Sequence, residues 1–143
     1  MKRCFYFIGM FVLASVTMIS CSKVGGPGAE TLDAIDQNDD VFPTITTSKP
    51  TVNQVYTSGD SIIVEGKVTD DKIVYKGKAQ IKNDSNNLVV ADNYYESHFL
   101  QAINFRLAYK AVVTVSTDFS VLVEFQDHGA NTSTTTIKVK VNP

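Results

Sequence analysis

The sequence predicts an all-β fold, an immunoglobulin-like antiparallel β-sandwich of seven or eight strands that follows a signal peptide and a flexible tether. Three observations lead to this fold class. Apolar and polar residues alternate with period two in several segments of residues 43–143. No segment keeps helical spacing beyond one or two turns. The segment also has the length of about 100 residues that is typical of such domains, so the 143-residue chain holds one folded domain.

The first twenty residues have the features of a secretory signal. Lys2 and Arg3 precede an uncharged, mostly apolar run over residues 4–19. A membrane-spanning helix needs about 20 apolar residues, and this run is shorter. We therefore predict a signal peptide over residues 1–20, with an uncleaved anchor helix as the alternative.

Residues 18–21, MISC, resemble the lipobox of bacterial lipoproteins, with Met18 where that family usually carries Leu. The resemblance implies cleavage before Cys21, lipidation of Cys21, and a chain anchored by lipid in the cell envelope of a Gram-negative bacterium, in the outer membrane. Cys4 lies in the segment that would be removed, so no thiol would remain for a disulfide.

Residues 21–42 follow as the lipidated cysteine and an acidic tether. They are rich in Gly and acidic residues and show no sustained apolar period, which indicates a flexible linker. Residues 22–40 would span about 24 Å as a random coil. The sandwich is then predicted over residues 43–143.

Alternation predicts the first strands in order. An edge strand over residues 44–48 is followed by strands over residues 61–69 and 73–82, which we expect to pair across the turn at residues 70–72. The expected inward residues of these two strands are Ile62, Val64, Val68, Ile73, Tyr75, Ala79 and Ile81. The outward positions of the second strand are Lys76, Lys78, Gln80 and Lys82.

The later strands vary in the clarity of their pattern. Weaker alternation predicts strands over residues 88–91, 99–107 and 109–116. Residues 119–126 and 136–141 alternate cleanly and should form the closing hairpin. Its expected inward residues are Phe119, Val121, Val123, Phe125, Ile137, Val139 and Val141.

The order of these segments carries a family resemblance. Pro43, Pro50, Tyr56, the run SIIVEGKVTDD, and FSVLVEFQDHGAN followed by TTTIKVKV resemble bacterial immunoglobulin-like and cadherin-like repeats, and the domain is similar to domain of unknown function 4625. The resemblance covers essentially all of residues 43–143 and implies the sandwich fold. The family's usual Asp-x-x-Gly-Asn turn appears as residues 127–131, with the Gly displaced by one.

Composition and motifs argue against two function classes. The formal net charge of −2 makes a nucleic-acid partner unfavourable. Nucleophilic catalysis needs a nucleophile beside an oriented base, and the chain offers only His98 and His128 and no Gly-x-Ser-x-Gly elbow. We therefore predict that the chain is not an enzyme, and an enzyme acting on an envelope polymer ranks third among the functions.

Carboxylates and amides gather at three loops that can meet at one end of such a sandwich. The predicted calcium ligands are Asp40, Asp70, Asp71, Asp127 and Asn131. Residues 36–40, DQNDD, also resemble the cadherin interdomain motif Asp-x-Asn-Asp-Asn. The alternative is that these residues serve ordinary turns, where Asp and Asn are favoured for their local hydrogen bonds. No cofactor other than calcium is expected.

Residues 92–100, DNYYESHFL, concentrate aromatic side chains in a region of poor alternation. Tyr94, Tyr95, His98 and Phe99 are the predicted recognition loop for a protein or glycan ligand, and the alternative is that they complete the core. The predicted function is a lipid-anchored binding or structural module of the cell envelope without catalysis. The alternative is a calcium-dependent adhesion module.

Overall fold

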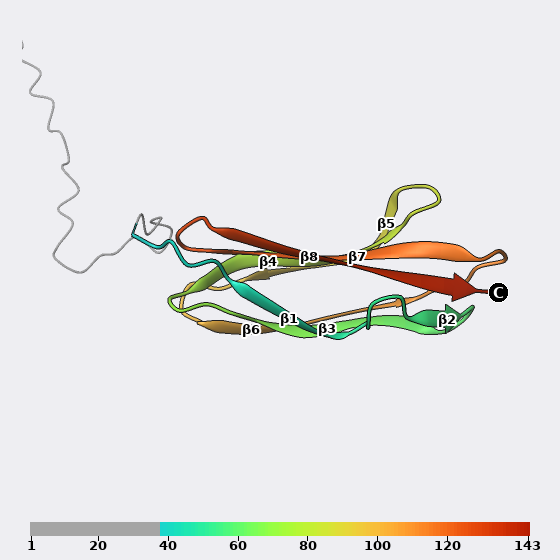
Figure 1. Ribbon diagram of the computed structural model, residues 1–143, viewed down its shortest axis with the longest axis horizontal. Coiled ribbons are helices and arrows are strands. Elements are labelled where there is room, and N and C mark those ends of the chain that lie inside the picture. Colours follow the sequence, from blue (N-terminus) through green and yellow to red (C-terminus); the bar gives the residue numbers. More distant parts are fainter. Residues whose placement is uncertain (1–37) are drawn as a thin grey trace, which may run out of the picture.

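The computed structural model describes residues 38–143, which form two β-sheets packed face to face (Figure 1). The strands of this part of the chain are β1 (Thr44–Lys49), β2 (Val55–Thr57), β3 (Ser61–Thr69), β4 (Val74–Asn83), β5 (Leu88–Glu96), β6 (Ala102–Lys110), β7 (Thr117–Asp127) and β8 (Thr132–Asn142). Within these residues, no helix has the length and apolar character needed to cross a membrane. The predicted all-β fold class is confirmed.

The strand order is that of an immunoglobulin-like sandwich. One sheet has the order β1-β3-β6 and the other the order β2-β8-β7-β4-β5. These correspond to immunoglobulin strands A, B and E facing strands G, F and C, with β5 added at the edge beside C. β1 pairs antiparallel with β3, whereas the short β2 pairs parallel with β8. The first two strands thus join different sheets.

The core lies between the sheets and is built from the inward positions of the alternating strands. Its largest fully buried side chains include Phe105 from β6 and Phe119 and Phe125 from β7. The Phe105 and Phe125 ring centroids lie 5.7 Å apart across the two sheets, within the range in which aromatic pairs attract. Many of the predicted inward residues are buried here: Ile62, Val64, Val68, Ala79, Ile81, Val121, Val123, Ile137, Val139 and Val141.

The predicted pairing of residues 61–69 with residues 73–82 is wrong. β3 lies between β1 and β6, whereas β4 lies between β7 and β5 in the other sheet. Both strands carry an apolar face, and these faces contribute to one core from opposite sheets instead of extending a single sheet. Residues 70–72 therefore cross from one sheet to the other rather than closing a hairpin.

The start of β4 also differs from its predicted facing. Alternation alone places Ile73 and Tyr75 inward, but Val74 is the fully buried residue and both of its neighbours are half-buried. The register of β4 against β7 shifts between Val74 and Lys76, as at a β-bulge, and such an irregularity changes the facing by one position.

The strands between residues 88 and 116 have different bounds from those predicted. β5 continues to Glu96, beyond the predicted end at residue 91. The two candidates at 99–107 and 109–116 are replaced by the single strand β6, and residues 111–116 form no strand. β2 has only three residues, too few for alternation to reveal. The closing hairpin of β7 and β8 is confirmed.

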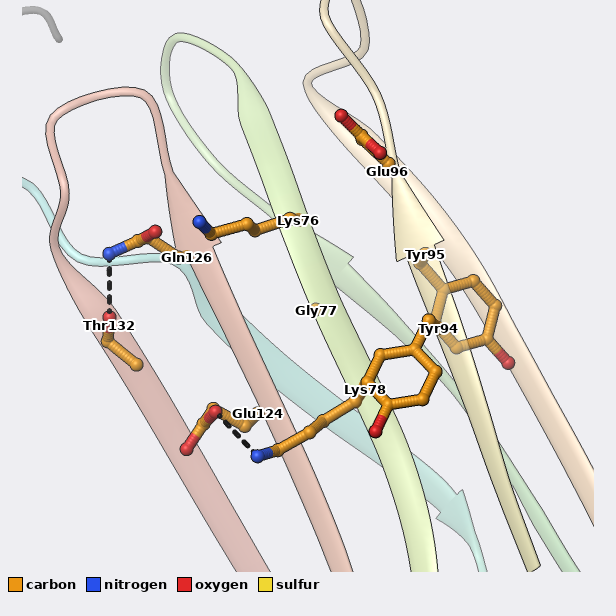
Figure 2. Close-up of a pocket in the computed structure, with 9 residues that line it drawn as sticks. All are labelled: Lys76, Gly77, Lys78, Tyr94, Tyr95, Glu96, Glu124, Gln126 and Thr132. Carbon is orange, nitrogen blue, oxygen red and sulfur yellow. Dashed lines mark hydrogen bonds and ion pairs between the residues drawn. The ribbon is translucent and has the colours of Figure 1, made fainter. Parts of the chain in front are cut away.

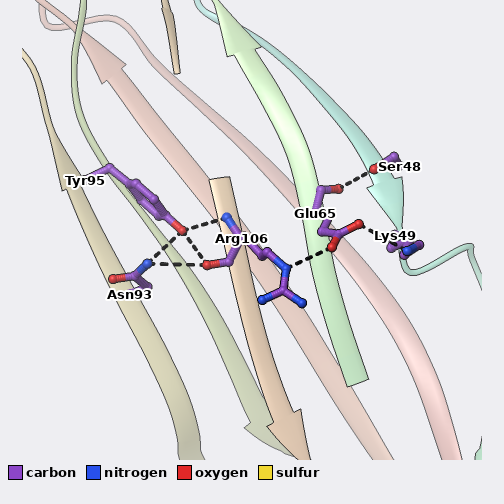
Figure 3. Close-up of polar contacts among 6 residues, drawn as sticks. All are labelled: Ser48, Lys49, Glu65, Asn93, Tyr95 and Arg106. Carbon is purple, nitrogen blue, oxygen red and sulfur yellow. Dashed lines mark hydrogen bonds and ion pairs between the residues drawn. The ribbon is translucent and has the colours of Figure 1, made fainter. Parts of the chain in front are cut away.

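A polar cluster on the three-stranded sheet ties its strands together (Figure 3). Glu65 in β3 accepts a hydrogen bond from Arg106 Nε of β6 at 2.9 Å and lies 3.2 Å from Lys49 Nζ, at the end of β1. The hydrogen bonds from Arg106 and then Lys49 lower the pKa of the Glu65 carboxyl below its ordinary value. The cluster therefore links all three strands of that sheet by charge.

Candidate functional site

The outer face of the five-stranded sheet carries two neighbouring rows of polar and aromatic side chains. Successive residues of a strand point to opposite faces, so the strand register decides which outward side chains lie side by side. One row crosses the strands as Thr132, Gln126, Lys76 and Glu96. The next row crosses them as Thr134, Glu124, Lys78 and Tyr94.

A hollow of about 430 Å³ lies over these rows, and we call it the Tyr94 groove (Figure 2). Its lining residues are Lys76, Gly77, Lys78, Tyr94, Tyr95, Glu96, Glu124, Gln126 and Thr132. Gly77 lies between the two rows, and its inward side is filled by the Phe125 ring. A Cβ on Gly77 would lie 2.2 Å from Phe125 Cδ1, so a larger residue cannot be placed there without moving the core.

The groove combines an aromatic face with paired polar groups. The Tyr94 side chain is 66% exposed. Lys78 Nζ lies 3.2 Å from Glu124 Oε1, and Gln126 Nε2 donates to Thr132 Oγ1 at 3.4 Å (Figure 2). A ligand in the groove would thus meet one side of a phenol ring together with hydrogen-bond donors and acceptors.

Tyr95, the neighbour of Tyr94, has its hydroxyl directed toward the other sheet (Figure 3). Its hydroxyl donates to the Arg106 carbonyl at 2.8 Å and accepts from the Arg106 amide at 2.9 Å. Asn93 Nδ2 donates to the same hydroxyl at 2.9 Å. Because β6 is an edge strand, the Tyr95 hydroxyl takes the place of a neighbouring strand for the backbone of Arg106.

The remaining two residues of the predicted recognition loop follow β5 and do not line the groove. The His98 ring packs among aromatic rings, with its centroid 5.4 Å from that of Tyr75 and 5.8 Å from that of His128. Phe99 is 73% exposed. The four predicted residues therefore occupy different places: Tyr94 and Tyr95 lie in a strand, and His98 and Phe99 lie in the loop after it.

Three acidic residues from distant parts of the chain meet at one end of the sandwich. Asp39 precedes β1, Asp70 follows β3, and Asp127 ends β7. The register brings the first two together, because the first residue of β1, Thr44, pairs with the last residue of β3, Thr69. One carboxylate oxygen from each of the three residues lies within 4.8 Å of the other two. We call this group the carboxylate trio.

Backbone amides fix one oxygen of each member of the trio. The three bonds are Val41 N to Asp39 Oδ1 at 3.2 Å, Lys72 N to Asp70 Oδ1 at 3.0 Å, and Asn131 N to Asp127 Oδ1 at 2.8 Å. Burial raises the pKa of the Asp70 carboxyl and outweighs the hydrogen bond from the Lys72 amide, which lowers it. The negative charges of Asp127, Asp39 and Asp71 raise this pKa further. The trio is thus a site of concentrated negative charge.

The predicted calcium ligands divide between the trio and its surroundings. Asp70 and Asp127 belong to the trio, whereas Asp40 and Asp71 are exposed and lie outside it. Asp39 takes the place predicted for Asp40. Asn131 directs its Nδ2 amide to Asp127 Oδ2 at 2.9 Å and to the Asp39 carbonyl at 3.0 Å, so this nitrogen supports the trio.

Gly129 provides the space that Asp39 occupies. A Cβ at Gly129 would lie 2.6 Å from Asp39 Cβ and 2.9 Å from the Asp39 carbonyl oxygen. Real Cβ atoms do not approach other atoms so closely, so the β7–β8 loop can pack against the segment before β1 only with glycine at this position.

From the acidic residues before β1, sequence reasoning chose Asp40 as a ligand rather than the buried Asp39, and it missed most of the groove. The outward facing of Lys76 and Lys78 was predictable, and the period of β7 places Glu124 and Gln126 outward in the same way. Alternation does not reveal the lateral register of β4 against β5 and β7, or of β7 against β8. This register places residues that are far apart in the chain side by side.

The signal peptide of residues 1–20, Cys21, and most of the tether of residues 21–42 lie outside the described residues. Their predictions stay predictions. In the described part of the tether, Asp39 is 7% exposed, so contact with the sandwich begins before the predicted boundary at Pro43.

No protein-family model and no curated protein matches the chain. Among solved structures, it is similar to the fibronectin(III)-like modules of Clostridium thermocellum CbhA, with a TM-score of 0.41 and 20% sequence identity. The similarity covers 71% of this chain and 46% of that chain, so this chain spans less than half the length of the solved one. A similarity of this size carries no information about ligand or function.

Proposed function

We propose that the chain is a lipid-anchored protein of the cell envelope whose sandwich binds a ligand in the Tyr94 groove without catalysing a reaction. The observation that supports this function best is the groove itself. Small-molecule sites are concave, with volumes of about 300–1,000 Å³ and a few polar groups beside apolar surface. At about 430 Å³, with the Tyr94 ring beside charged and amide groups, the groove fits that description.

The chemistry of the groove favours a glycan as the ligand. A sugar ring presents C–H groups that pack on an aromatic face, and its hydroxyls both donate and accept hydrogen bonds. Tyr94 offers the aromatic face, Lys76 offers donors, and Glu96 offers acceptors. A protein partner would cover about 800 Å² on each side of a standard interface, and the groove is a local hollow rather than a surface of that extent.

The anchor part of the proposal is supported by the sequence. Lys2 and Arg3, the apolar run that follows them and the MISC segment ending at Cys21 together have the organisation of a lipoprotein signal. The alternative function predicted from the sequence, a calcium-dependent adhesion module, would use the carboxylate trio, which has no residue in common with the groove lining.

The test is a titration of the full-length chain, solubilised in detergent, with soluble trisaccharides of glucose, xylose, mannose and galactose. Binding is followed by backbone amide chemical shifts. We expect at least one trisaccharide to shift the amides of Gly77 and Tyr94. Tyr94→Ala should weaken that binding by about two- to tenfold, since the loss of an aromatic contact is worth roughly 0.5–1.5 kcal/mol.

Phe99→Ala is the matched control, because Phe99 is also an exposed aromatic residue from the predicted recognition loop but lies outside the groove lining. It should leave the affinity unchanged. Equal losses for Phe99→Ala and Tyr94→Ala would move the binding surface to the loop. Amide shifts that avoid the groove with every trisaccharide would contradict the glycan assignment.

A further inference from the structure

Two oxygens of the carboxylate trio are buried without a hydrogen-bond donor. Asp39 Oδ2 and Asp70 Oδ2 are closed off from solvent and accept no hydrogen bond from the described residues. The whole Asp39 residue is only 7% exposed. Buried carboxylate oxygens in folded proteins normally face a donor or a positive charge, because removal of an anion from water is otherwise costly.

No donor of the described residues reaches these two oxygens, although hydrogen-bond donors lie close by. Asn131 donates its backbone amide to Asp127 Oδ1 and its side-chain amide to Asp127 Oδ2, at 2.8 and 2.9 Å. The Lys72 ammonium, which follows closely in sequence, donates to the Asn38 carbonyl at 3.2 Å. The three carboxylates converge, and two of their oxygens, Asp39 Oδ2 and Asp70 Oδ2, have no donor, so a cation at this place would supply the missing positive partner.

The spacing of the trio fits a calcium ion. Ca²⁺ binds oxygen ligands at about 2.3–2.6 Å, so two ligands on opposite sides of one ion are separated by about 4.6–5.2 Å. The three carboxylate oxygens lie within 4.8 Å of one another. Mg²⁺ demands a near-ideal octahedron and gives up its bound water reluctantly, so it usually takes one or two carboxylates rather than three. A set made of carboxylates alone suits a hard cation of this kind rather than zinc or copper.

The surroundings hold the trio in one arrangement. A backbone amide fixes one oxygen of each carboxylate, and the other oxygen of Asp39 and of Asp70 has no hydrogen-bond donor. Support of ligands by neighbouring hydrogen bonds is what gives metal sites much of their affinity. Gly129 contributes by leaving space for Asp39.

We propose that the carboxylate trio of Asp39, Asp70 and Asp127 is a calcium site that fastens the segment before β1 to the end of the sandwich. The ion joins three segments that are remote in sequence, and water completes its coordination. This site is separate from the Tyr94 groove, so the inference does not rest on the proposed binding of a glycan.

The experiment titrates Ca²⁺ into the full-length chain, solubilised in detergent and freed of divalent cations by a chelator. Calorimetry should give one Ca²⁺ per chain. At a calcium concentration of about 100 times the Kd, Tm should rise by on the order of 10 °C, and chelator should reverse the rise. Amide hydrogen exchange at Val41 and Asn131, whose amides bond to the trio, should slow when calcium is bound.

Three variants separate the trio from its acidic neighbours. Asp39→Asn, at a residue outside every strand, should weaken calcium binding at least tenfold because it removes one ligand charge. Gly129→Ala should also weaken it, since it displaces Asp39 while all three carboxylates remain. Asp40→Asn is the matched control: Asp40 is the exposed neighbour outside the trio, and its loss should leave affinity unchanged.

A Tm shift below about 2 °C at about 10 mM Ca²⁺ would overturn the calcium site. Loss of calcium binding in Asp40→Asn, with binding retained in Asp39→Asn, would also overturn it. An equal response to Mg²⁺ would overturn the choice of calcium. If Asp39→Asn does not fold without calcium, its refolding can be titrated with calcium instead. Refolding with the wild-type Kd would contradict a ligand role for Asp39.

Discussion

The Asp84 carboxylate lies in the turn between β4 and β5, where it faces two partners from neighbouring strands. Ser120 Oγ of β7 donates to its Oδ1 at 2.6 Å, and Lys138 Nζ of β8 donates to its Oδ2 at 2.6 Å. Burial alone would raise the pKa of this carboxyl, but the hydrogen bonds from Lys138 and Ser120 outweigh burial and lower it. The folded state therefore prefers the ionised form of Asp84.

This lowered pKa predicts a loss of stability in acid. The contribution of Asp84 is fully present above the ordinary carboxyl pKa of 3.8 and is lost as the pH falls through its lower folded pKa, because the unfolded chain takes up the proton first. Asp84→Asn should therefore lower the free energy of unfolding at pH 6 and flatten its decline below about pH 4. Urea unfolding measured from pH 2 to 7 tests this.

Asp92→Asn provides the control, because Asp92 is an exposed carboxylate of β5. In this variant, the free energy of unfolding should fall in acid as it does in the wild type. If the free energy of unfolding of Asp84→Asn fell with the same slope as that of the wild type, other carboxylates would be responsible for the loss of stability in acid.

For single residues, the sequence could predict which side chains of a strand point into the core. It could not predict the orientation of residues that lie outside the strands. Val64, Val121 and Phe125 are buried as alternation requires. Asp39 and Asp40 lie outside any strand, where no period decides which of two neighbouring carboxylates turns inward. The space beside Gly129 decides it, and that space exists only once the β7–β8 loop is in place.

Between the two sheets, β5 and β6 are joined through the hydroxyl of Tyr95, which bonds to both the amide and the carbonyl of Arg106. Tyr95→Phe keeps the ring and removes these bonds. We expect a destabilisation of about 0.5–1.5 kcal/mol, because the Arg106 backbone loses hydrogen bonds that are open to solvent. Chemical denaturation measures the loss, and the Arg106 amide should exchange faster with solvent.

Tyr94→Phe is the control for this element, since the exposed Tyr94 forms no part of the bridge. Its stability should match that of the wild type to within about 0.5 kcal/mol. If Tyr95→Phe proved equally neutral, water would be replacing the hydroxyl at the β6 edge, and the bridge would contribute no net stability.

Strands with clear alternation lie where they were predicted, although β8 begins at Thr132 rather than at residue 136, and strand partners were predicted less well. The β7–β8 hairpin follows from two alternating segments joined by a short turn. β3 and β4 have the same pattern and a short connection, yet they lie in different sheets. Alternation indicates that a strand has a buried face, but two buried faces meet equally well across a core or side by side within a sheet.

Across the whole molecule, the Tyr94 groove and the carboxylate trio lie near the same end of the sandwich. Gln126 and Thr132 line the groove, and Asp127 and Asn131 stand next to them in the chain at the trio. The described chain begins at this end (Figure 1). If residues 21–42 lead to a lipid anchor, both sites lie at the end of the domain that is nearest the membrane.

The anchor itself gives a prediction for the whole chain. Cys21→Ala removes the residue that the lipobox would modify, so the protein should leave the detergent phase in a phase-separation assay, and mass spectrometry should find no acyl chains. Cys4→Ala is the matched control, because Cys4 lies in the segment that would be removed, and it should partition as the wild type does. Unchanged partitioning of Cys21→Ala would favour an uncleaved apolar helix instead.

The placement of β1 and β2 in different sheets has a mechanical consequence. Inter-strand hydrogen bonds lie across the strand axis, so tension applied through the residues before Asp39 would first pull β1 along β3 and, once β1 had been displaced, β2 along β8. Such tension loads the bonds of each ladder together, as shear, rather than opening them one after another from an end. Resistance to force depends on the barrier to unfolding rather than on equilibrium stability. A domain held in this way would unfold slowly under a steady pull, even where its equilibrium stability is modest.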